Sequence, residues 1–202
     1  MNILAFDTCL DKMYVTFAFD SEIKDSRIVL NHDEKYHSAF LISTIKDVLK
    51  KNGMKPEDID LIATNIGPGS FTGIRACTTV ARAMAQQLDC KCIGISSLEI
   101  LSKIGNDSNC PVALDARKNK AYLYYENEIK GAIDLEEVKQ LLSDKQPVTD
   151  NKLKPILGGI SYQETEAQLG NILASLAYEK FRNCDCDWRK LKPLYIQPPP
   201  MG

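Results

Sequence analysis

The chain is poor in the residues that most often carry catalysis or hold a metal ion. Only two histidines, His32 and His37, occur in 202 residues. Their spacing does not give the His-x-x-x-His pair that binds a metal from one helix face, because Leu41 stands four residues after His37. The sequence also has no Gly-x-Ser-x-Gly segment, the elbow that carries a nucleophilic serine. These absences count against a histidine metalloenzyme and a serine hydrolase.

Cysteine patterns typical of zinc sites are missing as well. The chain has seven cysteines, an odd number, with two pairs of the Cys-x-Cys type, Cys90 with Cys92 and Cys184 with Cys186. Zinc knuckles use Cys-x-x-Cys instead, and neither pair has a histidine nearby. The first residues show neither the basic segment nor the apolar run of a signal peptide. We therefore expect reduced thiols, no metal and a cytoplasmic protein.

Excess charge and long apolar runs are also absent. The net charge is −2 and the isoelectric point is about 5.8, which gives no general attraction to nucleic acid or anionic membranes. No segment reaches the length of a membrane span. Hydrophobic residues make up 44% of the chain and charged residues 26%, which is typical of a globular protein that folds without disulfides.

One glycine-rich segment, residues 67–73, stands between a β-branched run and a run with helical spacing. Its three glycines and one proline predict a strand, a tight turn and a helix in direct succession. A hydroxyl of Ser70 or Thr72 can cap the helix. The segment is not a P-loop, because Ile74 replaces the lysine, and its third glycine comes one residue late for a dinucleotide fingerprint. Two functions stay open: an anion site at the helix N-terminus, or a rigid turn that aims the helix.

Strands and helices alternate along the chain, which predicts an α/β fold. After a polar linker at 105–109 the opening hairpin pattern returns, which suggests two related lobes. The expected strands cover residues 3–6, 13–19, 22–30, 60–66, 91–95, 111–114, 121–125 and 155–159. The expected helices cover residues 36–51, 74–88, 98–104, 134–142 and 167–181, and the tail at 192–200 is expected to be extended.

An aspartate ends the first strand of each expected lobe, Asp7 in one and Asp115 in the other. In two-lobed nucleotide-binding folds such carboxylates bind a metal–nucleotide, and a glycine follows so that a backbone N–H can meet phosphate. Here Thr8 and Ala116 follow instead. We favour the interpretation in which each carboxylate accepts backbone N–H groups in a turn.

Two further stretches could meet another macromolecule. The helix after the glycine-rich segment is rich in small residues, which is compatible with burial inside one lobe or with a close partner. A basic cluster near Trp188 could contact RNA phosphate or form a solvated face. The cluster comprises Arg182, Arg189, Lys190 and Lys192.

Taken together, four segments resemble the TsaB (YeaZ) family, and the resemblance runs nearly end to end. They are Ile-Leu-Ala-Phe-Asp-Thr at 3–8, Gly-Pro-Gly-Ser-Phe-Thr-Gly-Ile-Arg at 67–75, Asp-Ala-Arg at 115–117 and Pro-Leu-Tyr-Ile-Gln-Pro at 193–198. The resemblance implies an α/β fold of two actin-like (ASKHA, RNase H-like) lobes, the second one short. The lobes would be an N-terminal one over 1–104 and a shorter C-terminal one over 110–202 with an extended tail.

The resemblance also implies a function. Such a chain would be a non-catalytic scaffold subunit in the N6-threonylcarbamoylation of adenosine 37 in tRNA. The implied partners are a TsaD-like catalytic subunit, which carries the His-x-x-x-His metal site, and a TsaE-like ATPase on the heterodimer. The chain would form a homodimer when alone, and it would reach tRNA only through the complex, with no cofactor, metal or membrane. The alternative is a nucleotide-binding or metallopeptidase-like enzyme of the same superfamily.

Site residues follow from the same resemblance. The family-motif loop would aim the helix, with anion binding as a secondary role; it comprises Gly67, Pro68, Gly69, Ser70, Phe71, Thr72, Gly73 and Arg75. The partner interface would lie on the helices at 36–51 and 73–88; it comprises Phe40, Leu41, Thr44, Val48, Ala76, Thr79, Val80, Ala83 and Gln87. The sequence departs from the family where Lys118-Asn-Lys follows the Asp-Ala-Arg segment, because an acidic residue is common there.

Overall fold

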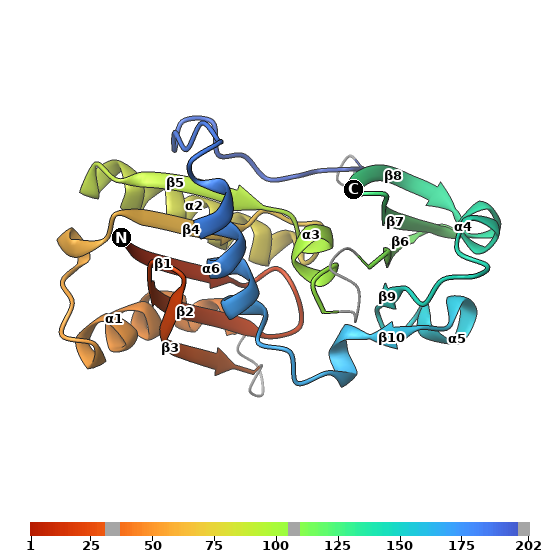
Figure 1. Cartoon of the computed structure of the whole chain (residues 1–202), viewed down its shortest axis with the longest axis horizontal. Helices are drawn as coiled ribbons and strands as arrows, with labels where there is room; N and C mark the ends of the chain where they lie inside the picture. The colour runs from red at the N-terminus through yellow and green to blue at the C-terminus, as the bar shows by residue number, and fades with distance from the viewer. Residues whose placement is uncertain (31–36, 105–109, 198–202) are drawn as a thin grey trace. The chain divides into compact units, whose positions relative to one another are not determined.

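The computed structural model of the chain describes residues 1–30, 37–104 and 110–197 (Figure 1). The chain divides into two compact units. The first unit comprises Met1–Ser97 together with Gln168–Leu194, and the second comprises Leu98–Ala167 together with the residues from Tyr195 onward. Each unit is built on one five-stranded sheet.

The sheet of the first unit has the strand order β3-β2-β1-β4-β5. Its first three strands form an antiparallel meander, and β4 and β5 continue the sheet in parallel with β1. The inner strand β4, between β1 and β5, is buried at every position, as expected for a parallel strand covered on both faces. The strands are β1 (Asn2–Asp7), β2 (Met13–Phe19), β3 (Glu22–Val29), β4 (Leu61–Asn65) and β5 (Lys91–Ile95).

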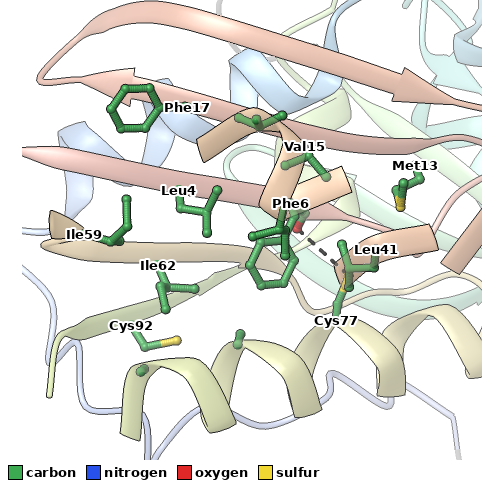
Figure 2. Close-up of a cluster of buried hydrophobic side chains, with 14 of the residues drawn as sticks. Leu4, Phe6, Met13, Val15, Phe17, Leu41, Ile59, Ile62, Cys77 and Cys92 are labelled. Carbon is green, nitrogen blue, oxygen red and sulfur yellow. Dashed lines mark hydrogen bonds between the residues drawn. The ribbon is translucent and has the colours of Figure 1, made fainter. Parts of the chain in front are cut away.

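Three long helices cover this sheet. Helices α1 (Leu41–Lys51) and α2 (Phe71–Leu88) share one hydrophobic core with one face of the sheet, and α6 (Leu169–Lys180) crosses strands β1 and β2 on the other face (Figure 1). Figure 2 shows the α2 side of this core, where Phe6 and Ile62 of the sheet lie toward the helix that carries Cys77.

The sheet of the second unit repeats the connectivity of the first. Its order is β8-β7-β6-β9-β10, again an antiparallel meander continued by two parallel strands. The strands are β6 (Val112–Arg117), β7 (Lys120–Tyr125), β8 (Glu128–Asp134), β9 (Val148–Thr149) and β10 (Ile160–Ser161). The helices are α3 (Ser97–Leu101), α4 (Leu135–Leu141) and α5 (Lys154–Leu157). The duplication suggested by the sequence is therefore confirmed, and α5 occupies the same place in the strand order as α2.

The predicted strand at 155–159 is wrong. Residues Lys154–Leu157 form the one-turn helix α5, and the short strand β10 starts only at Ile160. The Asp150 carboxylate accepts the N–H groups of Lys152 and Leu153, which starts a turn, and a proline in the first helical turn is well tolerated. The sequence analysis also missed β8, because this edge strand is polar and exposed along much of its length.

The expected lobe boundary differs from the observed one. The helix expected at 167–181 was predicted to belong to the second lobe, over 110–202, whereas α6 belongs to the first unit. The reason is the apolar face of α6, whose residues Leu169, Leu173 and Leu176 are buried. Helical periodicity identifies such a face but does not tell which sheet it will cover.

The helix expected at 36–51 begins later in the structure. A 3-10 turn at His37–Phe40 precedes α1, which starts at Leu41, and two further 3-10 turns lie at Pro56–Asp58 and Tyr162–Glu164. Some predicted features lie outside the described residues: His32, Tyr36, the linker at 105–109 and the tail end at 198–200. Among the helices of the described ranges, none combines the length and the apolar character needed to cross a membrane.

One expectation about the cysteines is wrong. Cys184 and Cys186 form a disulfide, although the sequence analysis expected reduced thiols throughout. The residues lie in a loop after α6 rather than in a regular strand, and there their Cα atoms are 5.6 Å apart, within the range that a disulfide requires. The free cysteines are Cys9, Cys77, Cys90, Cys92 and Cys110.

Candidate functional site

The buried side-chain amide of Asn65 holds the glycine-rich loop between β4 and α2. The Asn65 side-chain oxygen accepts the Gly67 N–H at 2.8 Å and the Ser97 hydroxyl at 2.9 Å. The Ser97 N–H in turn donates to the Gly67 carbonyl at 2.9 Å. The Asn65 amide nitrogen donates to the Asp7 carboxylate at 2.9 Å. One asparagine therefore links the loop to the end of β1.

Asp7 takes part in a turn, as the favoured interpretation predicted. Its second carboxylate oxygen accepts the Cys9 N–H at 2.6 Å, and the side chain is only 1% exposed. With Asn65 on one oxygen and a backbone N–H on the other, the buried carboxylate has the hydrogen bonds that such burial demands. This arrangement fixes the turn between β1 and β2.

The loop packs directly on that turn through its glycines. The Ser70 N–H donates to the Cys9 carbonyl at 2.7 Å, and the Thr8 hydroxyl donates to the Gly73 carbonyl at 2.8 Å. A Cβ added at Gly69 would overlap the Cys9 carbonyl, and one added at Gly73 would overlap the Thr8 carbonyl. Both glycines are therefore needed for close backbone approach, in which the start of α2 rests on the β1–β2 turn.

Helix α2 begins at this contact. Of the two predicted capping residues, Ser70 is the N-cap, and its hydroxyl accepts the Gly73 N–H at 3.3 Å. The Arg75 guanidinium lies 4.0 Å above the ring of Phe71, which places the two largest side chains of the motif together. The loop thus has the features of the turn that aims α2, and anion binding stays a prediction.

Beneath the loop lies a cluster that offers metal-ligating atoms. Within the described part of the chain, Asp7, Cys9 and Cys77 place one ligand atom each within 4.8 Å of the others. The Cys77 sulfur accepts the Thr8 N–H at 3.0 Å. Since the Thr8 hydroxyl gives its proton to Gly73, the Cys77 thiol donates to it at 3.0 Å. Burial, with Cys77 and Asp7 nearby, raises the pKa of Cys9. These hydrogen bonds tie α2 to the end of β1.

The outer faces of α1 and α2 carry most of the predicted interface residues. Exposed or half-buried positions are Phe40, Thr44, Ala76, Thr79, Val80, Ala83 and Gln87. Phe40 lies in the 3-10 turn before α1, and both Phe40 and Val80 also pack against the hydrophobic core. Leu41 and Val48 do not belong to this face, since they are 1% and 0% exposed and lie in the core between α1 and the sheet. Their assignment to the interface is wrong because both follow the buried stripe of α1.

One exposed residue on this face was missed by sequence reasoning. Ile42 lies beside the buried stripe of α1 and is 48% exposed. Its two neighbours on the buried side, Leu41 and Ile45, already fill the contact with the sheet. A signal was available, because Ile42 does not fall on the i, i+4, i+7 row that starts at Leu41.

In the second unit Asp115 has an ionic environment. Its carboxylate accepts the Arg117 N–H at 2.9 Å and the Lys152 ammonium at 2.8 Å, and its own N–H donates to Asp150 at 2.7 Å. Partial burial works to raise the pKa of Asp115, but Lys152 and the Arg117 N–H outweigh this effect, so the pKa lies below its ordinary value. The predicted turn role is confirmed here too.

The basic cluster near Trp188 is partly neutralised. The Lys190 ammonium pairs with Asp185, and the Arg189 guanidinium lies 3.5 Å from Asp187 and 5.0 Å from the Trp188 ring. Trp188 itself packs against the core of the first unit. RNA contact by this cluster stays a prediction.

Two α/β lobes with the same strand order, each with an aspartate at or near the end of its first strand, define the class of two-lobed proteins with an actin-like fold. A Listeria monocytogenes protein described as an N-acetylmannosamine kinase shares this fold at a TM-score of 0.53 and 9% identity, over 91% of this chain and all of its own, 100%. YeaZ from Pseudomonas aeruginosa aligns at a TM-score of 0.74 and 20% identity, over 96% of this chain and 99% of its own.

Sequence comparison narrows the class to a family. The family model described as "TsaD: tRNA N6-adenosine threonylcarbamoyltransferase" matches residues 28–145, more than half of the chain. The Bacillus subtilis tRNA threonylcarbamoyladenosine biosynthesis protein TsaB is 29% identical over 162 residues, which is 78% of this chain and 69% of that protein. The chain belongs to this threonylcarbamoyltransferase family and, within it, to the TsaB (YeaZ) group.

Proposed function

We propose that this protein is a non-catalytic scaffold subunit that supports N6-threonylcarbamoylation of adenosine in tRNA by binding a TsaD-like catalytic subunit. Family membership supports the pathway, because curated relatives are named for the biosynthesis of threonylcarbamoyladenosine. The sequence contains no His-x-x-x-His pair, so the catalytic metal site would belong to the partner.

The single observation that carries the proposal is the outer face of α2. Its inner face is sealed in the core through Ile74, Cys77 and Ala81. Its outer face presents small side chains, with Thr79 and Ala83 exposed. Helices approach each other most closely where the contacting side chains are small, so this face is suited to a helix from another subunit. The exposed Ile42 of α1 adds apolar surface to the same unit.

The loop gives this face a fixed direction. Since Ser70 and Gly73 rest on the β1–β2 turn, the start of α2 cannot pivot without breaking the hydrogen bonds to Cys9 and Thr8. A preformed interface loses less conformational entropy on binding than a mobile one. The motif loop would therefore act on partner affinity through the rigidity of α2, without touching the partner.

The wider assembly follows from the same role. A TsaE-like ATPase would dock on the heterodimer, and tRNA would be reached through the complex. In the absence of the catalytic subunit, two copies would pair through the same face as a homodimer. The complex would act in the cytoplasm.

The test is co-purification with the TsaD homologue of the same cell. Ala83→Arg places a long charged side chain on the exposed face of α2, and we expect it to weaken the complex by about tenfold or more, which is about 1.4 kcal/mol. Gln140→Arg, on the exposed side of α4, is the matched control and should leave binding unchanged. If the Ala83→Arg protein co-purifies as well as the control, α2 is not the interface.

An enzyme or nucleotide-binding role is the competing hypothesis. Calorimetry of the isolated chain with ATP and Mg²⁺ separates the two proposals. We expect no micromolar binding, because Asp7 already accepts hydrogen bonds from Asn65 and Cys9, and Asp115 accepts them from Arg117 and Lys152. Micromolar affinity would argue for the enzyme.

A further inference from the structure

The two Cys-x-Cys segments, far apart in sequence, lie side by side in the first unit. Cys90 and Cys92 flank the start of β5, and Cys184 and Cys186 lie in the loop after α6. The Cys92 N–H donates to the Cys186 carbonyl at 2.9 Å, so the loop lies against β5. The chain therefore carries two pairs of the same spacing in different backbone conformations.

Backbone conformation decides which pair can form a bond. In an extended strand, residues two apart are separated by about 6.6 Å, close to the limit for a disulfide, and β5 holds Cys92 in that conformation. Burial raises the pKa of Cys90 to about 11 and that of Cys92 to about 12, so neither is a ready nucleophile. The Cα atoms of Cys184 and Cys186 are only 5.6 Å apart, and these two residues are bonded.

The bonded pair is also accessible. Cys184 and Cys186 are half-buried, so a small thiol can reach them from solvent. Asp185 stands between the two cysteines and forms an ion pair with Lys190.

The pair begins a segment that we call the strap, Cys184–Leu194. Beyond the disulfide, Trp188 and Leu191 of the strap pack against the hydrophobic core, and the Leu194 N–H donates to the Ile66 carbonyl at 2.8 Å. The strap therefore runs from the edge of β5 to the residue before the glycine-rich loop. Its apolar anchors hold it in place independently of the disulfide.

We propose that Cys184 and Cys186 form a thiol–disulfide exchange site for low-molecular-weight thiols, and that the bond constrains the backbone at Cys186, whose carbonyl accepts the Cys92 N–H of β5. In the forward direction one thiolate attacks a protein sulfur, the S–S bond breaks, and the other cysteine leaves as a thiolate that takes up a proton. A second thiolate then attacks the external sulfur of the mixed disulfide. It releases the remaining cysteine, which is also protonated, and an oxidised disulfide of the small thiol.

The experiment uses the full chain equilibrated with reduced and oxidised glutathione at a series of ratios. Samples are quenched with acid, alkylated and mapped by peptide mass. We expect one two-electron transition, with alkylation appearing at Cys184 and Cys186 together as the buffer becomes more reducing. Any mixed disulfide with glutathione should map to the same peptide. Cys90 and Cys92 should show no transition in the native protein.

Two double variants are matched controls. Cys90→Ser with Cys92→Ser should retain the transition, and Cys184→Ser with Cys186→Ser should abolish it. Hydrogen exchange at the Cys92 amide should become about tenfold faster on reduction, because a tether on its acceptor is lost. The exchange site is overturned if the pair is alkylated equally at every ratio or if the transition maps to Cys90 and Cys92. An unchanged Cys92 exchange rate overturns the role of the bond in constraining the backbone at Cys186.

Discussion

The two lobes share one strand order, but the aspartate of the first strand has different hydrogen-bond partners in each lobe. In the first lobe the aspartate at the end of the first strand is buried and meets the neutral amide of Asn65. In the second lobe the corresponding Asp115 has a side chain 21% exposed and meets the ammonium of Lys152. The buried Asp7 carboxylate accepts hydrogen bonds from neutral donors, whereas the more exposed Asp115 forms an ion pair that water screens.

The helices that follow differ more. After Asn65 the chain makes the glycine-rich loop and the 18-residue helix α2, whereas after Asp150 it makes α5, of only four residues. The first lobe thus has an additional long surface in the place where the second has one turn. Duplication of a sheet therefore does not duplicate the surface that a partner could bind.

The largest loss of stability should come from a substitution at the backbone contact where α2 begins. Gly73→Ala should lower the free energy of unfolding by about 3 kcal/mol, because the added Cβ would overlap the Thr8 carbonyl. Urea denaturation measures the change. Thr72→Ala, at the exposed neighbouring position, is the control and should change stability by less than about 0.5 kcal/mol. Equal stability of the two variants would mean that close backbone packing is not required.

Matched aspartate variants test the comparison directly. Asp7→Asn puts a second amide beside Asn65 and the Cys9 N–H, and should cost about 2 kcal/mol of unfolding free energy because a buried polar contact is lost. Asp115→Asn should cost less than about 1 kcal/mol, since its ion pair is exposed. Urea denaturation of both variants in parallel measures the two losses of unfolding free energy. Similar losses would refute the distinction between the lobes.

Substitutions at two threonines should change stability by a smaller amount and in opposite directions. Thr64 and Thr149 each precede the residue that faces the lobe's aspartate. The Thr64 hydroxyl donates to the Phe6 carbonyl at 3.1 Å, whereas the buried Thr149 hydroxyl has no hydrogen-bond partner among the described residues. Thr64→Val should destabilise and Thr149→Val should stabilise the protein, each by about 1 kcal/mol, measured by thermal unfolding. A loss of stability in both would contradict the model of an unsatisfied Thr149.

The smallest expected effect is on how stability depends on pH through Asp115. The folded-state pKa of Asp115 lies below 3.8, so its contribution to stability is present above that ordinary value and is lost as pH falls through the folded pKa. An NMR titration of the Asp115 carboxyl should show the pKa rising toward 3.8 in Lys152→Gln. Lys139→Gln removes a different ion pair of the same lobe, with Glu136, and should leave the Asp115 pKa in place. A pKa that does not respond to Lys152 would assign the shift to the backbone alone.

Local signals in the sequence were enough for α2 and its loop. The glycines, Ser70 and the apolar row of α2 each specify geometry within a few residues, and the structure follows them. The close approach of Gly69 and Gly73 to the β1–β2 turn was not predictable, since it depends on two segments about sixty residues apart meeting in space.

Other features could not be predicted because they also depend on contacts between distant segments or on elements too short to show a pattern. Strand β9 and strand β10 have two residues each, too few to show a period. Leu41 and Val48 lie on the apolar stripe of an amphipathic helix, and the stripe alone does not tell whether the sheet or another subunit covers it. The pairing of Cys184 with Cys186 depends on a loop conformation that the spacing of the residues does not encode.

Helix α6 has a consequence for how the protein is made. During synthesis the sheet of the first lobe can pair its strands by Ile95, but the residues that cover its second face, Leu169 onward, emerge only after the whole second sheet. A nascent chain therefore carries an uncovered apolar sheet face from the completion of β5 until α6 has been made. A fragment cut at residue 104 would keep that exposed face permanently.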